Sequence, residues 1–348
     1  GRIDPRRVAR RVTSPPDAPL DLARLEEDLS RVFRIGDFEM VDYSLEPSDE
    51  PPARDLVVHT RDKRWGPNYL RLGMAFEGHL DGRAEIAIFL YHRLAAINRL
   101  GAEWRNQASL GDRLGLVTEF YQPLRTDGRF FVAPRALGKV DKRLRYVEYD
   151  ISEIVANKRL EANLDLGVNM SHWGELRLGA YHGRSATSIE RSAFPLDEDE
   201  TLGGWHGRLI LDQLDDVDFP RRGWAVEVEG RLSRDALGAT TPYDRLYLSA
   251  HGAVTRGRST VNGHVEAGTS FGDALPFHDR CELGGVGRLS AFERGRLFGD
   301  DMVLLRAGFF YQILRTGQPL STSIYAGFSG EAGQAWDQAD SPALDDLI

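Results

Sequence analysis

The residues best suited to covalent chemistry lie between positions 268 and 272. Gly268-Thr269-Ser270-Phe271-Gly272 matches the G-x-S-x-G spacing of a nucleophile elbow, in which a serine attacks an ester. An elbow needs a strand, a sharp turn and a helix, followed along the chain by an acid and a histidine. The residues after Gly272 show no helical period. We therefore interpret Ser270 as the end of a strand and expect no catalytic residue in this chain.

A metal ion is the second chemistry that the sequence suggests. His278 and Asp279 lie beside Cys281, the single cysteine of the chain, while the nearest other histidine, His264, lies across a strand. A structural zinc site takes four closely spaced cysteine or histidine ligands. We interpret these residues as structural and expect no metal and no cofactor. The acidic run 197–200 is expected in a solvated loop, with cation binding as the less favoured alternative.

The elements that carry these residues alternate in polarity. Between 303 and 313 every odd position is apolar, whereas the even positions include Arg306 and Gln312. A period of two predicts a strand with one apolar and one polar face. The same pattern predicts thirteen strands, at 68–79, 83–95, 99–110, 112–122, 129–145, 149–170, 174–188, 201–214, 223–234, 243–256, 259–272, 302–314 and 320–336.

The connections between these strands differ in length. Those after even-numbered strands are mostly short, whereas those after odd-numbered strands include the excursion 277–301. Long alternating strands joined in this way are typical of a mainly β transmembrane antiparallel barrel in an outer membrane. The six tryptophans mostly fall near expected strand ends (Trp65, Trp104, Trp173, Trp205, Trp224 and Trp336), which fits interfacial anchoring, with burial in a soluble core as the less favoured alternative. Bacterial barrels have even strand counts, so thirteen strands imply further strands beyond Ile348.

Residues 1–60 have a different pattern. A short helix is expected to end near Val12, and a second helix has apolar residues at helical spacing from Leu22 to Phe33, with Gly36 as its stop. Strands are expected at Phe38–Leu45 and Asp55–Thr60. Such a module is too small for a robust core of its own and is expected to dock on something larger. The net charge of −9 argues against a nucleic-acid partner.

A family resemblance is carried by the long excursion. ELGGVGRLSAF, with Gly299 downstream, resembles the sixth extracellular loop of the bacterial surface antigen superfamily, which includes the BamA and TamA assembly factors and two-partner secretion transporters. The resemblance implies a periplasmic POTRA module at 1–60 that lacks its first strand. It also implies a 16-stranded outer-membrane barrel at 61–348 that lacks its last strands.

Several segments are most similar to patatin-like phospholipases within that superfamily: KRWGPNYLRLGM, LGAEWRNQASLG, TEFYQPL with FFVAP, LGGVGRLSAF and YAGFSGEAGQAW. This similarity implies that the barrel anchors or exports an attached N-terminal patatin domain, a lipid hydrolase, across the outer-membrane bilayer. The resemblance also allows a second copy of the chain as a partner, in a homodimer. The alternative function is general assembly of outer-membrane proteins or two-partner secretion.

The resemblance also implies a binding site in the loop and the barrel lumen. Where the superfamily has Val/Leu-Arg-Gly-Phe/Tyr, this chain has Leu289, Ser290, Ala291 and Phe292, and the acid that usually receives the arginine matches Glu331. We expect Glu331 to bond Arg288, Arg294 or the Ser290 hydroxyl, with the loop folded into the barrel. A polar network around the loop is favoured over an open pore. The full predicted set is Gly284, Gly285, Arg288, Leu289, Ser290, Ala291, Phe292, Arg294, Gly299 and Glu331.

Overall fold

The structure of the protein is a computed structural model. It describes residues 8–9, 12–15, 18–33, 38–48, 52–62, 68–78, 84–111, 114–147, 150–171, 173–189, 197–216, 218–315 and 323–337. The chain forms two compact units, of which one comprises Gly1–Ala136 with Leu166–Asn169 and the other Leu137–Asp165 with Met170–Ile348. No helix within these described ranges is long and apolar enough to cross a membrane.

The N-terminal module contains helix α2 (Leu22–Phe33) and the antiparallel strands β1 (Phe38–Pro47) and β2 (Arg54–Asp62). Val32 of the helix packs on Phe38 of β1, and both are fully buried. These elements confirm the predicted second helix and both strands. The predicted stop at Gly36 lies outside the described residues, as does most of the first predicted helix. The assignment of 1–60 to a POTRA module remains a prediction.

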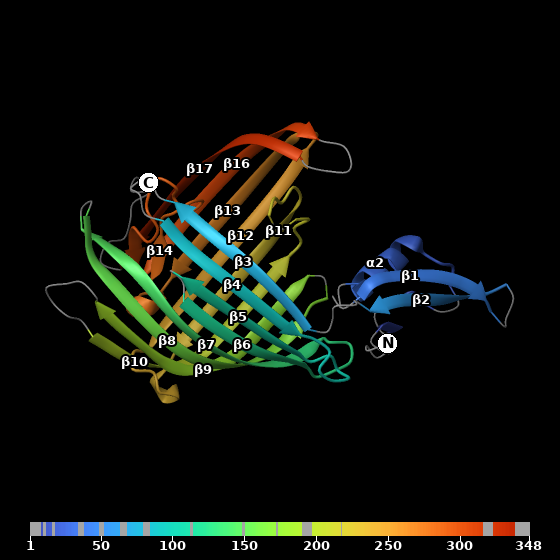
Figure 1. Cartoon of the computed structure of the whole chain (residues 1–348), viewed down its shortest axis with the longest axis horizontal. Helices are drawn as coiled ribbons and strands as arrows, with labels where there is room; N and C mark the ends of the chain where they lie inside the picture. Colours follow the sequence, from blue (N-terminus) through green and yellow to red (C-terminus); the bar gives the residue numbers. More distant parts are fainter. Residues whose placement is uncertain are drawn as a thin grey trace. The chain divides into compact units, whose positions relative to one another are not determined.

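The rest of the described chain is dominated by one sheet of thirteen strands, in the order β17-β16-β13-β12-β11-β10-β9-β8-β7-β6-β5-β4-β3 (Figure 1). Neighbouring strands pair antiparallel from β3 to β6 and from β9 to β17. The strands are β3 (Asn68–Gly78), β4 (Ala84–Leu94), β5 (Glu103–Gly111), β6 (Leu114–Pro123), β7 (Phe130–Val147), β8 (Asp150–Asn169), β9 (Gly174–Ile189), β10 (Asp197–Asp212), β11 (Gly223–Ser233), β12 (Tyr243–Arg256), β13 (Ser259–Thr269), β16 (Asp301–Arg315) and β17 (Ser323–Trp336).

All thirteen predicted strands are present, and one detail of the prediction is wrong. The acidic run 197–200 is not a loop: it begins β10 and pairs with residues 185–188 of β9, whose serines and threonine tolerate charged neighbours. Trp205 lies in the middle of β10, whereas Trp104, Trp224 and Trp336 lie at strand ends. Trp173 lies in the turn before β9, and Trp65 is outside the described residues.

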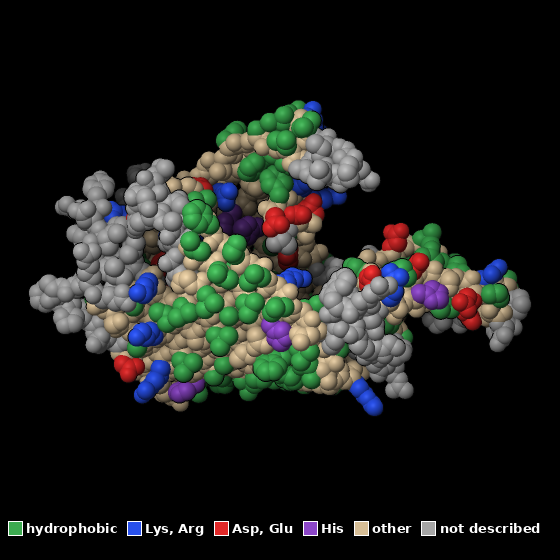
Figure 2. All heavy atoms as spheres, in the orientation of Figure 1, with side chains coloured by type: hydrophobic (Ala, Val, Ile, Leu, Met, Phe, Trp, Pro, Cys, Tyr) green, Lys and Arg blue, Asp and Glu red, His purple; other side chains and the backbone are tan. Residues whose placement is uncertain are grey.

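Strand register collects the apolar positions on one face of the sheet, here called the apolar face. One row across five neighbouring strands consists of Leu209, Val228, Leu248, Ala267 and Val303. Many side chains of this face are exposed, with 70% of Leu72, 66% of Leu160 and 72% of Phe328 accessible. Figure 2 shows apolar side chains spread over the strands turned toward the viewer, with few charges among them. A large exposed apolar surface marks contact with lipid or with another protein.

The opposite face of the sheet, here called the polar face, carries charged residues. Arg231 of β11 pairs in register with Arg245 of β12, and Arg306 of β16 with Glu331 of β17. Strands β3 and β17 stand at the two ends of the sheet order. Closure into a 16-stranded barrel therefore remains a prediction.

Candidate functional site on the polar face

Residues 270–300, here called the loop segment, connect β13 to β16. The segment contains the short antiparallel strands β14 (Cys281–Leu283) and β15 (Leu297–Gly299), which pattern reasoning missed because three residues show no period. Two glycines allow it to fold tightly. Gly284 has φ +121°, and a Cβ there would lie 2.0 Å from the Glu293 carbonyl oxygen. A Cβ on Gly299 would lie 2.4 Å from the Trp336 backbone nitrogen.

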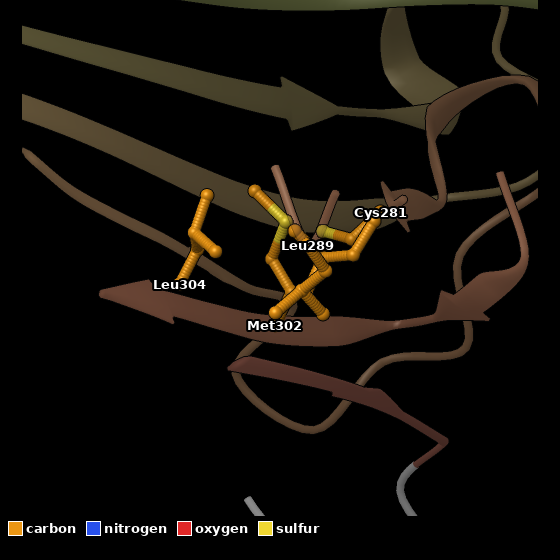
Figure 3. Packing of buried hydrophobic residues seen from close by; sticks show 5 residues of the cluster. Cys281, Leu289, Met302 and Leu304 are labelled. Carbon is orange, nitrogen blue, oxygen red and sulfur yellow. The ribbon is translucent and has the colours of Figure 1, made fainter. Parts of the chain in front are cut away.

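The loop segment is seated on an apolar cluster at the start of β16. Met302 and Leu304 occupy even positions of this strand, which belong to the polar face, and are 3% and 0% exposed. Cys281, Leu283 and Leu289 of the loop segment cover them, as Figure 3 shows for the labelled members of the cluster. Leu289 has φ +69°, an unusual conformation for a residue with a Cβ, and its burial in this cluster holds it there.

A buried ionic network anchors the first part of the loop segment. Asp279, in the single turn of 3₁₀ helix η2 (Phe277–Asp279), forms ion pairs with Arg159 Nη1 of β8 at 2.9 Å and Arg231 Nε of β11 at 3.0 Å. Glu161 pairs with the same two arginines, and its Oε2 lies 2.6 Å from Arg231 Nη2. Each of the four side chains is at most 8% exposed. Two cations thus balance two anions, as buried charges require.

Aromatic groups complete this network. The Tyr243 hydroxyl donates a hydrogen bond to Asp279, and the Arg231 guanidinium lies 3.7 Å from the centre of the Tyr181 ring. Burial by itself would raise the pKa of Asp279, but the Arg231 and Arg159 guanidiniums hold it well below its usual range. Asp279 is therefore a charged anchor for the loop segment, and no substrate is needed to explain it.

His278 adjoins the anchor but is not part of the ionic network. Its Nδ1 lies 3.3 Å from Glu200 Oε2, and its side chain is 2% exposed. Burial lowers the pKa of His278 to about 4, so the imidazole is neutral at neutral pH. No group of three or more His, Cys, Asp or Glu residues in the described ranges is arranged to hold a metal ion.

The tip of the loop segment contacts the acid that the sequence singled out. Glu331 accepts hydrogen bonds from the Ser290 backbone N–H at 2.6 Å and from the Ser290 hydroxyl at 3.1 Å. Arg288 instead pairs with Glu266 of β13, at 2.6 Å. Among the described residues, Glu331 pairs with the cation Arg306, its register partner on β16, whose Nε lies 3.8 Å from Glu331 Oε1. Of the three predicted donors, the structure brings Ser290 to Glu331.

The remaining predicted residues shape the tip. Gly285 donates its N–H to the Phe292 carbonyl, and Phe292 packs against the apolar cluster. Ala291 and Arg294 are exposed, and Arg294 lies beside Gly285. The sequence did not predict the anchoring set of Arg159, Glu161 and Arg231. Its only signal was the regular placement of charges between the apolar positions of β8 and β11.

Ser270 does not lie in an elbow. Its side chain is fully buried, and its N–H donates to Asp301 Oδ1 at 2.8 Å. The residues that follow form a turn, η2 and β14, so the described chain lacks the helix that must follow the nucleophile.

The fold is thus a long antiparallel sheet, apolar on one face and polar on the other, with a long loop packed on its polar side. It is similar to BamA from Haemophilus ducreyi lacking POTRA domains 1–3 (TM-score 0.69, 14% identity, 97% of this chain and 70% of that chain covered). It is also similar to CdiB from Acinetobacter baumannii (0.61, 13%, 98% and 63%) and CdiB from Escherichia coli (0.56, 12%, 96% and 68%). No protein-family model matches the sequence, and no curated protein matches it.

Proposed function

We propose that this chain is an outer-membrane β-barrel protein that assembles or secretes other polypeptides, with residues 1–60 as a POTRA module in the periplasm. The observation that carries the proposal is the division of the sheet into two faces. Exposed apolar rows suit a lipid environment on one side, whereas buried ion pairs on the other side suit a protein-filled lumen. The fold similarity to BamA and CdiB supports the same function.

In this proposal the loop segment is a plug seated in the lumen. Asp279, Arg159, Arg231 and Glu161 fix its base, the Met302–Leu304 cluster holds its middle, and Glu331 receives its tip. A polypeptide that follows the polar face has to pass these contacts, so the plug sets how readily the path opens.

Membrane insertion is tested by placing one guanidinium on either face of β11. Val228 lies in an apolar row, and Glu229 is its neighbour on the polar face, opposite Arg208. An arginine at the bilayer midplane costs about 2–4 kcal/mol in such barrels. Val228→Arg should therefore abolish heat-modifiable migration of the outer-membrane fraction on gels, whereas Glu229→Arg should retain it. Equal loss in both variants would contradict the face assignment.

Polypeptide handling is tested in lipid vesicles that contain the purified chain. These vesicles should speed the insertion of an unfolded outer-membrane polypeptide, or the transfer of a secreted one, relative to vesicles that contain the heat-denatured chain. An unchanged rate for both kinds of polypeptide would overturn this part of the proposal.

A second candidate is a barrel that anchors or exports an attached patatin-like lipase. The observation that favours it is Ser290, which bonds Glu331 where assembly factors have an arginine. Under this reading, residues 1–348 alone should not hydrolyse phospholipids, whereas the same chain joined to its N-terminal patatin domain should, and Ser270→Ala should leave that activity intact. Ester hydrolysis by residues 1–348 that is lost in Ser270→Ala would restore the elbow hypothesis.

A further inference from the structure

The turn between β10 and β11 folds across the sheet. Residues 218–222 of this turn are here called the strap. The Phe219 ring lies 5.3 Å from the Phe310 ring of β16 and 4.5 Å from the Tyr325 ring of β17, measured between centroids. In the sheet order, β16 and β17 are the third and fourth strands beyond β11. At about 4.8 Å per strand the strap therefore crosses β12 and β13.

The strap lies on the polar face. Phe310 is at an even position of β16, as are Arg306 and Gln312, and Tyr325 is the register partner of Gln312. Successive residues of a strand point to opposite faces, so Phe310 and Tyr325 belong to the polar face. The Phe219 ring of the strap therefore packs on this face, against both rings.

The strap also contacts the start of β13 through Thr255, beside Thr260, whose register partner on the polar face is Phe310. Thr260 is 0% exposed, although it comes directly after the two-residue turn 257–258 and Ser259. The Thr255 hydroxyl donates to the Arg221 carbonyl at 2.8 Å and lies 2.8 Å from the Thr260 hydroxyl. The two threonines thus link the strap to the sheet through a chain of hydroxyl groups.

The shape of the strap is held by hydrogen bonds to two aspartates that precede it in the same turn. Asp216 Oδ1 accepts hydrogen bonds from the N–H groups of Asp218 and Phe219, both at 2.9 Å. Asp215 Oδ1 accepts from the N–H groups of Arg221 and Arg222 at 2.8 and 2.9 Å. Phe219 is half-buried, as are Phe310 and Tyr325. The strap can therefore keep its shape if its described contacts with the sheet, which are two between aromatic rings and one hydrogen bond, are broken.

We propose that the strap is a latch, which closes the polar face at the end where β12 and β13 are joined by the two-residue turn, and which swings away reversibly. The loop segment lies at the opposite ends of β13 and β16, so the strap is a second, independent closure. Its role in the passage of polypeptides rests on the proposed function, but its opening does not.

The opening is measured by the reactivity of a thiol beneath the strap. Thr260→Cys places a side chain of similar size there, and native Cys281 is buried, so its background is given by the wild-type chain. A charged, water-soluble methanethiosulfonate should label Thr260→Cys slowly, and at least tenfold faster when Phe219→Ala is added. Arg256→Cys, exposed in the same turn region, provides the reference rate. Phe328→Ala, on the apolar face, is the matched aromatic control and should change neither rate.

Two results would overturn the latch. Equal labelling of Thr260→Cys with and without Phe219→Ala, in chains that retain heat-modifiable migration, would mean that Phe219 does not hold the strap closed. If Thr260→Cys remains unlabelled long after Arg256→Cys has reacted fully, the strap does not open and is a fixed part of the fold. The assay needs only the folded chain in detergent, so it succeeds or fails independently of membrane insertion and polypeptide handling.

Discussion

The polar face is covered at its two ends by different kinds of contact. At one end the loop segment is anchored by four buried charges, with Asp279 between Arg159 and Arg231. At the other end the strap is held by half-buried aromatic rings and one hydrogen bond from Thr255. Breaking a buried charge network leaves uncompensated ions, whereas separating aromatic rings costs far less. The buried charges therefore favour a permanent anchor, whereas the aromatic contacts favour a reversible closure.

The largest expected effect comes from neutralising the anchor. Asp279→Asn keeps the shape of the side chain but leaves Arg159 and Arg231 with only Glu161, at a cost of about 3–5 kcal/mol. The temperature at which heat-modifiable migration is lost should fall by roughly 5–10 °C. Glu227→Gln, which disrupts the exposed pair with Arg208, is the matched control and should shift it far less. Equal shifts would mean that the anchor is as hydrated as the exposed pair.

Acid should weaken the same end of the molecule through His278. Its pKa is about 4 in the folded chain against 6.5 ordinarily, so the unfolded chain binds the extra proton between these values. The contribution of neutral His278 to the free energy of unfolding is therefore complete above pH 6.5. It is lost as the pH falls toward 4, and the loss is about 3 kcal/mol at most. Unfolding midpoints in urea at pH 7 and pH 4.5 should differ less for His278→Gln than for the wild-type chain. An identical pH dependence of the two chains would show that protonation of His278 does not cause the loss of stability.

Substitutions of Ser290, at the tip of the loop segment, should change stability by a moderate amount. Ser290→Ala removes the hydroxyl bond to Glu331 but keeps the backbone N–H bond, at a cost of about 1 kcal/mol. Ser290→Arg should be tolerated, because Ser290 is exposed and the added guanidinium can pair with Glu331 beside it. The rate of proteolytic cleavage within the loop segment measures how firmly the tip is held in both variants. Faster cleavage of Ser290→Arg than of Ser290→Ala would contradict the proposed role of Glu331.

The smallest expected effect concerns the internal support of the strap. Asp216→Ala removes the acceptor for the N–H groups of Asp218 and Phe219 without touching the sheet. Labelling of Thr260→Cys should rise about three- to fivefold, which corresponds to about 0.6–0.9 kcal/mol of lost support. A rise as large as that of Phe219→Ala would mean that the shape of the strap, rather than its aromatic contacts, holds it closed.

The strands could be predicted from the sequence because alternation is a local property. Every odd position from Val303 to Ile313 is apolar, and β16 follows. Met302 and Leu304 are apolar on the other face as well, a departure that indicated the seat of the loop segment and was missed. The anchor could not be predicted, because Arg159 and Asp279 are 120 residues apart and meet only once the loop segment folds back. The strap contact depends equally on a turn whose direction no local pattern specifies.

Strand β16 offers the most direct test that the apolar face contacts lipid and that the polar face lines a covered interior. Nitroxide labels placed singly at positions 303–313 in lipid vesicles report access to oxygen, which concentrates in lipid, and to a water-soluble nickel complex. Oxygen access should peak at Val303, Leu305, Ala307 and Phe309 and drop at Leu304, Arg306 and Gly308, which share the covered face. A profile without a period of two, or with its oxygen maxima at the even positions, would contradict the claim.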